Sequence, residues 1–323
     1  MASAETALPK AGQPIAIALT RPSTSLWRDA WRRMLRNRPA VVSMMYIAIL
    51  LLVALFANFV APFPYAKQDL NNTESGPTLL HPFGTDNLGR DLFSRIVYGS
   101  RISLAVAIVD ILIVLAIGVP LGLMAGFFGK WLDTLIMRIV DILYAFPNLL
   151  LIIVVITYLR AVLDQPQQGL GETVGALDKL TGGLLGVFIA LGIISWLTVA
   201  RLVRGQVLSL KEKEFIESAR AVGSKNGRIM FSHLLPNVIA PVIIAATFGI
   251  PGAIAAEAGL SFLGLGVRPP LPSWGILIAE GTRSMRAFPH LLLFPGGVLA
   301  ITLICFNFLG DGLRDALDPK MKM

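Results

Sequence analysis

The stretch LSLKEKEFIESARAVGSKNGRIMFSHLLP occupies residues 208–236 and is a long polar and basic insertion between two strongly apolar runs. Its first half has apolar residues at the spacing of one helix face, namely Phe215, Ile216, Ala219 and Val222. The pattern predicts a short amphipathic helix, and the partner of that helix decides what the protein does.

Gly223 comes directly after this helix and is predicted to be its C′ residue, because a left-handed cap is cheapest in a residue without a Cβ. Ile229, Met230 and Leu234 indicate a second short helix, and Pro236 is expected to mark the next boundary. The insertion is therefore predicted to fold as a small helical hairpin.

The composition of the chain favours a polytopic membrane protein. Of its 323 residues, 55% are hydrophobic and 15% are charged, whereas soluble domains usually carry about 25% charged residues. The net charge of +8 does not indicate nucleic-acid binding, because the basic residues flank apolar runs and orient them in a membrane. The single cysteine, Cys305, lies in an apolar run and is expected to be a small buried hydrophobe.

Six apolar runs, each long enough to cross the roughly 30 Å core of a bilayer, predict an all-α fold with about six transmembrane helices. The expected spans are residues 41–61, 102–127, 135–159, 182–202, 238–258 and 290–309. The distribution of Lys and Arg predicts that both termini and the 203–236 loop are cytoplasmic. The remaining parts are expected to be a disordered tail at 1–23, a basic interfacial helix at 24–40 and a cytoplasmic tail at 311–323, with the transmembrane domain at 41–310.

One group of charges conflicts with this topology. Arg90, Arg95 and Arg101 fall on the outer side, where an excess of positive charge is unusual. Asp86 and Asp91 are expected to offset them, in a segment that folds instead of lying free.

Two spans carry ionisable residues. Charges in spans face a bundle interior or water, so Asp110 in the second span is expected either to line a pathway or to bond a polar partner on a neighbouring helix. Arg138 and Asp141 at the start of the third span are three residues apart and are expected to pair on one helix face.

The motifs of the common hydrolytic chemistries are absent. The patterns G-x-x-x-x-G-K-[ST], H-E-x-x-H and G-x-S-x-G do not occur, and the three histidines are scattered. No catalytic residue, metal site or cofactor is therefore expected in this chain, which must draw its energy from a gradient or from a partner.

The 208–236 stretch resembles the cytoplasmic loop of importer-type ABC transporter permeases, whose pattern is E-A-A, three residues, Gly, nine residues, then I-x-L-P. Ser218 replaces the first alanine and His233 the isoleucine, and both keep the small size and hairpin shape. In that family the loop forms a coupling helix that docks in a groove of a separate ATPase. The resemblance assigns this role to Glu217, Ser218, Ala219, Arg220, Gly223, Leu235 and Pro236.

Three further segments, residues 81–104, 257–275 and 310–319, look like the C-type permease subunit of dipeptide and oligopeptide importers. That resemblance implies an importer-type ABC permease fold in the inner or plasma membrane of a bacterium or archaeon. It also implies a second homologous permease, two cytoplasmic ATPases that hold ATP and Mg, and an extracytoplasmic binding protein. Nickel, opine and antimicrobial-peptide uptake systems use similar subunits, so the cargo stays open between these and peptides.

The predicted function is therefore the translocation-pathway subunit of an ATP-driven importer of dipeptides or oligopeptides. The rival is a gradient-driven transporter acting alone, with Asp110 as its ion or proton site. Segment 257–275 has glycines and prolines that cannot continue a straight span, and it is expected to line part of the outer mouth. The candidate pathway residues are Asp110, Glu257 and Phe262.

Overall fold

The computed structural model describes residues 26–163, 175–178, 181 and 183–317, and the regular secondary structure within them is helical. The tail expected at 1–23 lies outside these residues. Five of the described helices are long and apolar enough to cross a membrane, or six if one strongly bent pair is a single span. The all-α fold with about six transmembrane helices is thereby confirmed.

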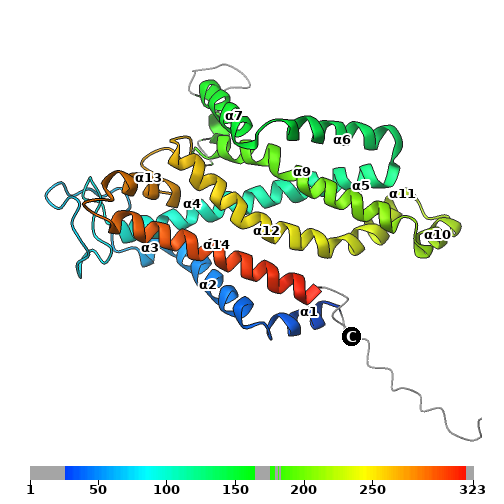
Figure 1. The fold of residues 1–323 in the computed structure, drawn as a ribbon, viewed down its shortest axis with the longest axis horizontal. Helices are drawn as coiled ribbons and strands as arrows, with labels where there is room; N and C mark the ends of the chain where they lie inside the picture. Colours follow the sequence, from blue (N-terminus) through cyan, green and yellow to red (C-terminus); the bar gives the residue numbers. More distant parts are fainter. Residues whose placement is uncertain (1–25, 164–174, 179–180, 182, 318–323) are drawn as a thin grey trace, which may run out of the picture.

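The long helices run side by side along the long axis of the molecule (Figure 1). They are α2 (Arg38–Leu55), the continuous series α4 (Leu92–Ile113), η1 (Val114–Gly118) and α5 (Val119–Phe128), then α9 (Leu185–Leu210), α12 (Leu235–Phe262) and α14 (His290–Leu317).

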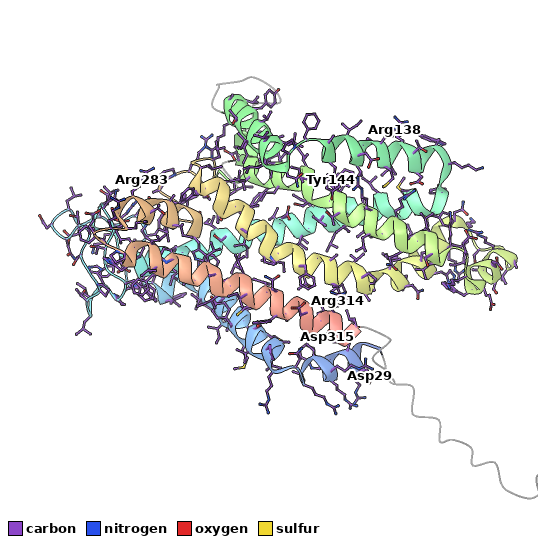
Figure 2. All side chains as sticks on the ribbon, viewed as in Figure 1. Asp29, Arg138, Tyr144, Arg283, Arg314 and Asp315 are labelled. Atoms are coloured by element: carbon purple, nitrogen blue, oxygen red, sulfur yellow. The ribbon has the colours of Figure 1, made fainter. Side chains whose placement is uncertain are left out.

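Shorter elements gather at the two ends of this bundle (Figure 1). One end carries α3 (Ala57–Val60), the irregular segment 61–91 and α13 (Trp274–Ser284). The other carries α1 (Leu26–Met34), α10 (Glu214–Ala221), α11 (Asn226–Arg228) and η2 (Ile229–Leu234). Figure 2 shows Asp29, Arg314 and Asp315 at this second end and Arg283 at the first.

Helix α1 is fastened to the bundle instead of lying alone on a surface. Its Ala30 and Met34 side chains are buried and pack with Ala40 of α2 and Ala316 of α14. Trp31, beside this buried face, remains 52% exposed, so it can meet lipid. The basic helix thus joins the beginning and the end of the bundle.

The third apolar run is bent. Helix α6 (Lys130–Ala145) and helix α7 (Asn148–Leu163) meet at an angle of 92°. Pro147 lies at the bend, and the preceding Phe146 is extended, with ψ at 141°. A residue before proline is driven out of the helical region, so the bend is set locally by the sequence. The expected span 135–159 therefore contains two helices of different direction.

Helices α5 and α9 approach closely along three glycines one turn apart. A Cβ added at Gly122 would lie 2.6 Å from the Ala200 carbonyl oxygen and 2.7 Å from the Val203 side chain, and Gly118 and Gly126 face α9 in the same way. Small residues let helix backbones approach in a membrane, where lipid competes with any larger apolar contact.

We expect Gly122→Val to destabilise the protein by about 1–3 kcal/mol, because the added atoms overpack the α5–α9 contact. Thermal unfolding in detergent measures the change. Gly205→Val is the matched control, since a Cβ at Gly205 of α9 meets nothing within 4 Å. Equal melting temperatures for the two variants would contradict the packing argument.

Candidate functional site

The predicted cap of the loop helix is present. Helix α10 ends at Ala221, and Gly223 follows with a φ of +81°. The Gly223 N–H donates to the Arg220 carbonyl over 2.9 Å, and the Ser224 N–H donates to the Ala219 carbonyl over 3.0 Å. These two bonds form a Schellman motif, which satisfies carbonyls that the end of a helix leaves open.

The apolar face of α10 is narrower than the sequence pattern indicates. Ile216 is fully buried and Ala219 is partly buried, and both pack with Ile229 and Leu234 of the second half of the hairpin. Val222 is 87% exposed, because the chain has left the helix at that position. Phe215 is 41% exposed, so the face predicted from four residues buries chiefly one.

A hollow of about 680 Å³ lies between the two halves of this hairpin. Exposed Phe215 and Val222 give it an apolar floor, and Lys225 and Arg228 give it a basic edge. Of the seven residues that the sequence assigns to coupling, the structure brings three to this hollow, namely Ser218, Ala219 and Gly223. Glu217, Arg220 and Pro236 are exposed nearby, and Leu235 is partly buried.

Pro236 does not end the second helix of the hairpin. Residues 226–262 form one continuous helix of 37 residues. The proline lies in the first turn of α12, directly after the π-helical turn η2, in which the Leu235 N–H bonds to the Met230 carbonyl. That wider turn shifts the hydrogen-bond register, so the helix continues through Pro236 although proline has no N–H to donate. The loop is thus rigidly joined to a membrane-spanning helix.

A second hollow lies halfway along the bundle, between α4, α7, α9 and α12, and has a volume of about 510 Å³. Asp110 lines it together with Asn148, Ser195 and Thr198, and the remaining lining is aliphatic, glycine or phenylalanine. The Asp110 side chain is 3% exposed, and its Oδ1 atom has no hydrogen-bond partner among the described residues.

The pair expected within α6 is replaced by contacts to α9. Arg201 of α9 donates to the Asp141 carboxylate over 2.5 Å, and its guanidinium lies 4.2 Å from the ring centre of Tyr144. Arg204 holds both oxygens of Asp133, over 2.5 and 2.6 Å. The expected partnership of Arg138 with Asp141 is therefore wrong, because α6 lies along α9 and the longer-range partner reaches Asp141.

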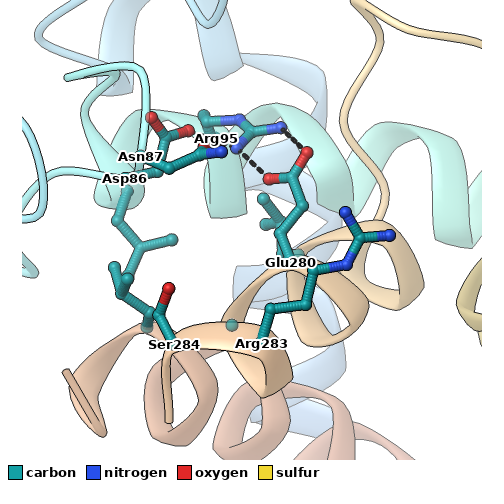
Figure 3. A pocket seen from close by; sticks show the side chains of 10 residues that line it. Asp86, Asn87, Arg95, Glu280, Arg283 and Ser284 are labelled. Carbon is teal, nitrogen blue, oxygen red and sulfur yellow. Dashed lines mark hydrogen bonds and ion pairs between the residues drawn. The ribbon is translucent and has the colours of Figure 1, made fainter. Parts of the chain in front are cut away.

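Two of the three arginines that conflicted with the topology, Arg90 and Arg95, belong to a buried network at the end of the bundle opposite the hairpin. Figure 3 shows the part of this network formed by Arg95 and Glu280. Asp86 accepts bonds from Arg90, over 2.7 Å, and from Arg95. Arg95 also bonds Glu280 of α13, over 2.5 Å. A small hollow of about 50 Å³ lies beside these side chains. The expected offset by Asp86 is correct, and sequence reasoning missed Glu280, which lies 185 positions away from Arg95.

The remaining charged groups of this end have other partners. Asp91 begins α4 by accepting a bond from the Ser94 N–H over 2.7 Å, and it bonds His81 over 2.8 Å. Arg101 donates to the carbonyls of Ala54 and Leu55, over 2.5 and 2.8 Å, at the end of α2. A cation at a helix C-terminus is favourable, so Arg101 acts as a cap and needs no offsetting carboxylate.

Glu257 does not line either large hollow. It is fully buried where α4, α12 and the beginning of α13 meet. Its carboxylate accepts bonds from Ser261 over 2.6 Å and from Ser103 over 3.2 Å. Phe262 is 50% exposed at the end of α12, outside the residues that line the cavity at Asp110. Of the three pathway candidates, the cavity contains Asp110 alone.

Comparison with known sequences and structures places this geometry among transport proteins. The profile of a family described as "Binding-protein-dependent transport system inner membrane component" matches residues 118–323, and one described as "N-terminal TM domain of oligopeptide transport permease C" matches residues 25–82. The chain also resembles an inward-facing structure of the MetNI methionine ABC transporter. The TM-score is 0.54, with 21% identity over 69% of this chain and 96% of that chain.

Several whole sequences are similar over nearly their full length. The dipeptide transport system permease protein DppC of Alkalihalophilus pseudofirmus is 42% identical over 93% of this chain and 92% of its own. The glutathione transport system permease protein GsiD of Pectobacterium atrosepticum is 40% identical over 92% of both chains. The oligopeptide transport system permease protein OppC of Bacillus subtilis is 39% identical over 94% of this chain and 93% of its own.

Proposed function

The chain belongs to the family of inner membrane components of binding-protein-dependent transport systems, and from this premise we propose that it is the translocation-pathway subunit of an ATP-driven importer of peptides. It is an inner-membrane protein with the fold of an ABC importer permease. The relatives reported above are named for dipeptides, oligopeptides and glutathione, all of them peptides. That shared chemistry favours short peptides over nickel or opines as the cargo.

The single observation that carries the coupling half of the proposal is the capped helical hairpin formed by α10, α11 and η2, which follows the end of α9 at Leu210. Exposed Phe215 of α10 and exposed Val222, directly after that helix, line the hollow of about 680 Å³. An amphipathic helix that keeps apolar side chains exposed fits a groove in a partner. We propose that this partner is one of two cytoplasmic ATPase subunits, which hold ATP and Mg, and that this chain itself is non-catalytic.

The pathway half of the proposal rests on the cavity at Asp110. A cavity of about 510 Å³ lies in the size range of small-molecule sites. In this proposal a second, homologous permease closes the pathway from the other side, and an extracytoplasmic binding protein delivers the cargo to the end formed by 61–91 and α13. The hairpin end and both termini are then cytoplasmic. Binding outside and ATPase closure inside bias one bistable bundle between two states.

Reconstitution tests this function. Vesicles that contain this chain, the second permease and both ATPases are expected to accumulate a labelled tripeptide when ATP and the loaded binding protein are present. Omission of either the ATPases or the binding protein is expected to abolish uptake. Uptake by this chain alone, driven by a proton gradient, would contradict the proposal and support the stand-alone transporter.

A further inference from the structure

The open Oδ1 atom of Asp110 is the feature that the coupling function does not explain. Its residue is 3% exposed, and Oδ1 has no hydrogen-bond partner in the described part of the chain. An ionised carboxylate that is buried with one open oxygen is strongly unfavourable in a membrane protein, unless it takes up a proton or a positive group binds it. Among the described residues that line its cavity, there is no Lys, Arg or His to serve as that group.

Asp110 also stands at a special position along the chain. It is equally far from the two ends of the continuous 92–128 helix, so it lies at the middle of that helix. Directly after it, the helix widens into the π turn η1, and the Val114 N–H is shared between the Asp110 and Ile111 carbonyls. Such turns recur at functional sites, where they re-aim side chains.

The part of the cavity wall that α12 forms leaves room for a ligand. Gly249 and Gly252 of α12 line the same cavity, and a Cβ added at either would meet nothing within 4 Å. Ser195 and Thr198 of α9 and Asn148 of α7 complete the lining with neutral polar groups. The cavity thus combines one negative charge, several hydrogen-bonding groups and open space.

We propose that Asp110 binds the amino-terminal ammonium group of a peptide in transit. The inference rests on the proposed peptide cargo and goes beyond it by naming the chemical group that this chain recognises. Every free peptide carries an N-terminal ammonium whatever its sequence, so a single carboxylate can recognise peptides of varied side chains. The ammonium satisfies the open oxygen of Asp110 with a charge-assisted hydrogen bond.

The decisive comparison is between peptides with a free and a blocked amino group. The complete four-subunit transporter in detergent, without nucleotide or binding protein, is dialysed against labelled trialanine, N-acetyl-trialanine or trialanine amide. Asp110→Asn is expected to weaken the binding of trialanine and its amide about tenfold or more and to leave the N-acetyl peptide unchanged. Asp110→Glu, which keeps the charge, is expected to retain most of the binding.

Two further variants keep this test falsifiable. Asp141→Asn is the matched control, because its carboxylate is 67% exposed, pairs with Arg201 and lies outside the cavity; it is expected to bind all three peptides normally. Gly252→Leu keeps the Asp110 carboxylate but fills the open space beside α12. It is expected to weaken the binding of all three peptides alike. The result for Gly252→Leu can be measured even if the Asp110→Asn transporter fails to assemble.

The outcomes separate this inference from the proposed function. If the wild-type vesicles import peptide and Asp110→Asn binds free and acetylated trialanine as the wild type does, the inference fails and the importer stands. If Asp110→Asn weakens both peptides equally, the carboxylate pairs with a basic side chain of the second permease, and the inference is overturned. Failure of wild-type uptake would instead overturn the proposed function.

Discussion

Gly223→Asp is expected to lower ATP-dependent uptake tenfold or more while the chain still inserts in the membrane and assembles its bundle. Gly223 has a φ of +81° and closes the Schellman cap of α10. A residue with a Cβ costs about 1–2 kcal/mol more in this conformation. Aspartate adds a negative charge next to the C-terminus of α10, where an anion is unfavourable.

The local nature of the cap explains why insertion survives this change. Gly223 is exposed, and a Cβ there meets nothing within 4 Å, so no core contact is lost. The substitution distorts the backbone beside the hollow that Ser218 and Ala219 line. That hollow is the surface proposed to receive the ATPase. A loss of 1.4 kcal/mol in that contact corresponds to about tenfold weaker docking. Uptake is therefore expected to fall by tenfold or more.

Uptake, stimulated ATPase activity and co-purification of the ATPases are the three measurements. Gly227→Asp is the matched control, because Gly227 lies in the same hairpin, has open space around its Cβ position and lacks a positive φ. That variant is expected to stay close to the wild type. Normal uptake and ATPase stimulation by Gly223→Asp would show that the hairpin is not the docking element.

Arg95→Met is expected to have the largest effect on stability, with a loss of about 3 kcal/mol. The Arg95 side chain is 2% exposed and joins Asp86 to Glu280. When it is removed, Asp86 keeps Arg90 as a partner, whereas Glu280 keeps only a 3.5 Å contact to Arg90. The Glu280 side chain is 31% exposed, so water screens part of the penalty, which places the estimate at the lower end for a broken buried pair.

Thermal unfolding and limited proteolysis of segment 61–91 measure this effect. Arg283→Met is the control, since Arg283 borders the same small hollow but is exposed, and it is expected to stay within about 0.5 kcal/mol of the wild type. The double variant Arg95→Met with Glu280→Met is expected to recover part of the loss, because it leaves no open carboxylate on α13. Equal melting temperatures for the Arg95→Met and Arg283→Met variants would show that the link from Asp86 through Arg95 to Glu280 does not stabilise the fold.

Features set by neighbouring residues could be predicted from the sequence. The number of spans follows from apolar runs, because a bilayer leaves helices as the means of satisfying the backbone. The cap at Gly223 follows from its place after an amphipathic turn, and Gly264 likewise ends α12, with a φ of +80° and the Leu265 N–H bonded to the Leu260 carbonyl. In these cases the deciding interactions lie within about five positions.

Features set by distant residues could not be predicted in this way. Asp141 pairs with Arg201, 60 positions away, although Arg138 is nearer in sequence. Glu257 is held by Ser103, 154 positions away. Sequence reasoning placed it in the pathway as part of segment 257–275, whose glycines and prolines cannot continue a straight span. The serines in the apolar runs could have indicated that Glu257 is a buried acceptor, since a hydroxyl in a span needs an acceptor.

The uninterrupted 226–262 helix has a mechanical consequence. From Ile229 at the hairpin to Gly249 at the cavity wall, a rise of 1.5 Å per residue gives a lever about 30 Å long. If the helix turns by about 10° about its hairpin end, the position of Gly249 moves by roughly 5 Å, about one helical turn. Gly249 and Gly252, which lie bare at the cavity, would sweep across the space in front of Asp110. In the proposed importer, a movement that the ATPase imposes on the hairpin would thus reach the cavity at Asp110 through this one helix.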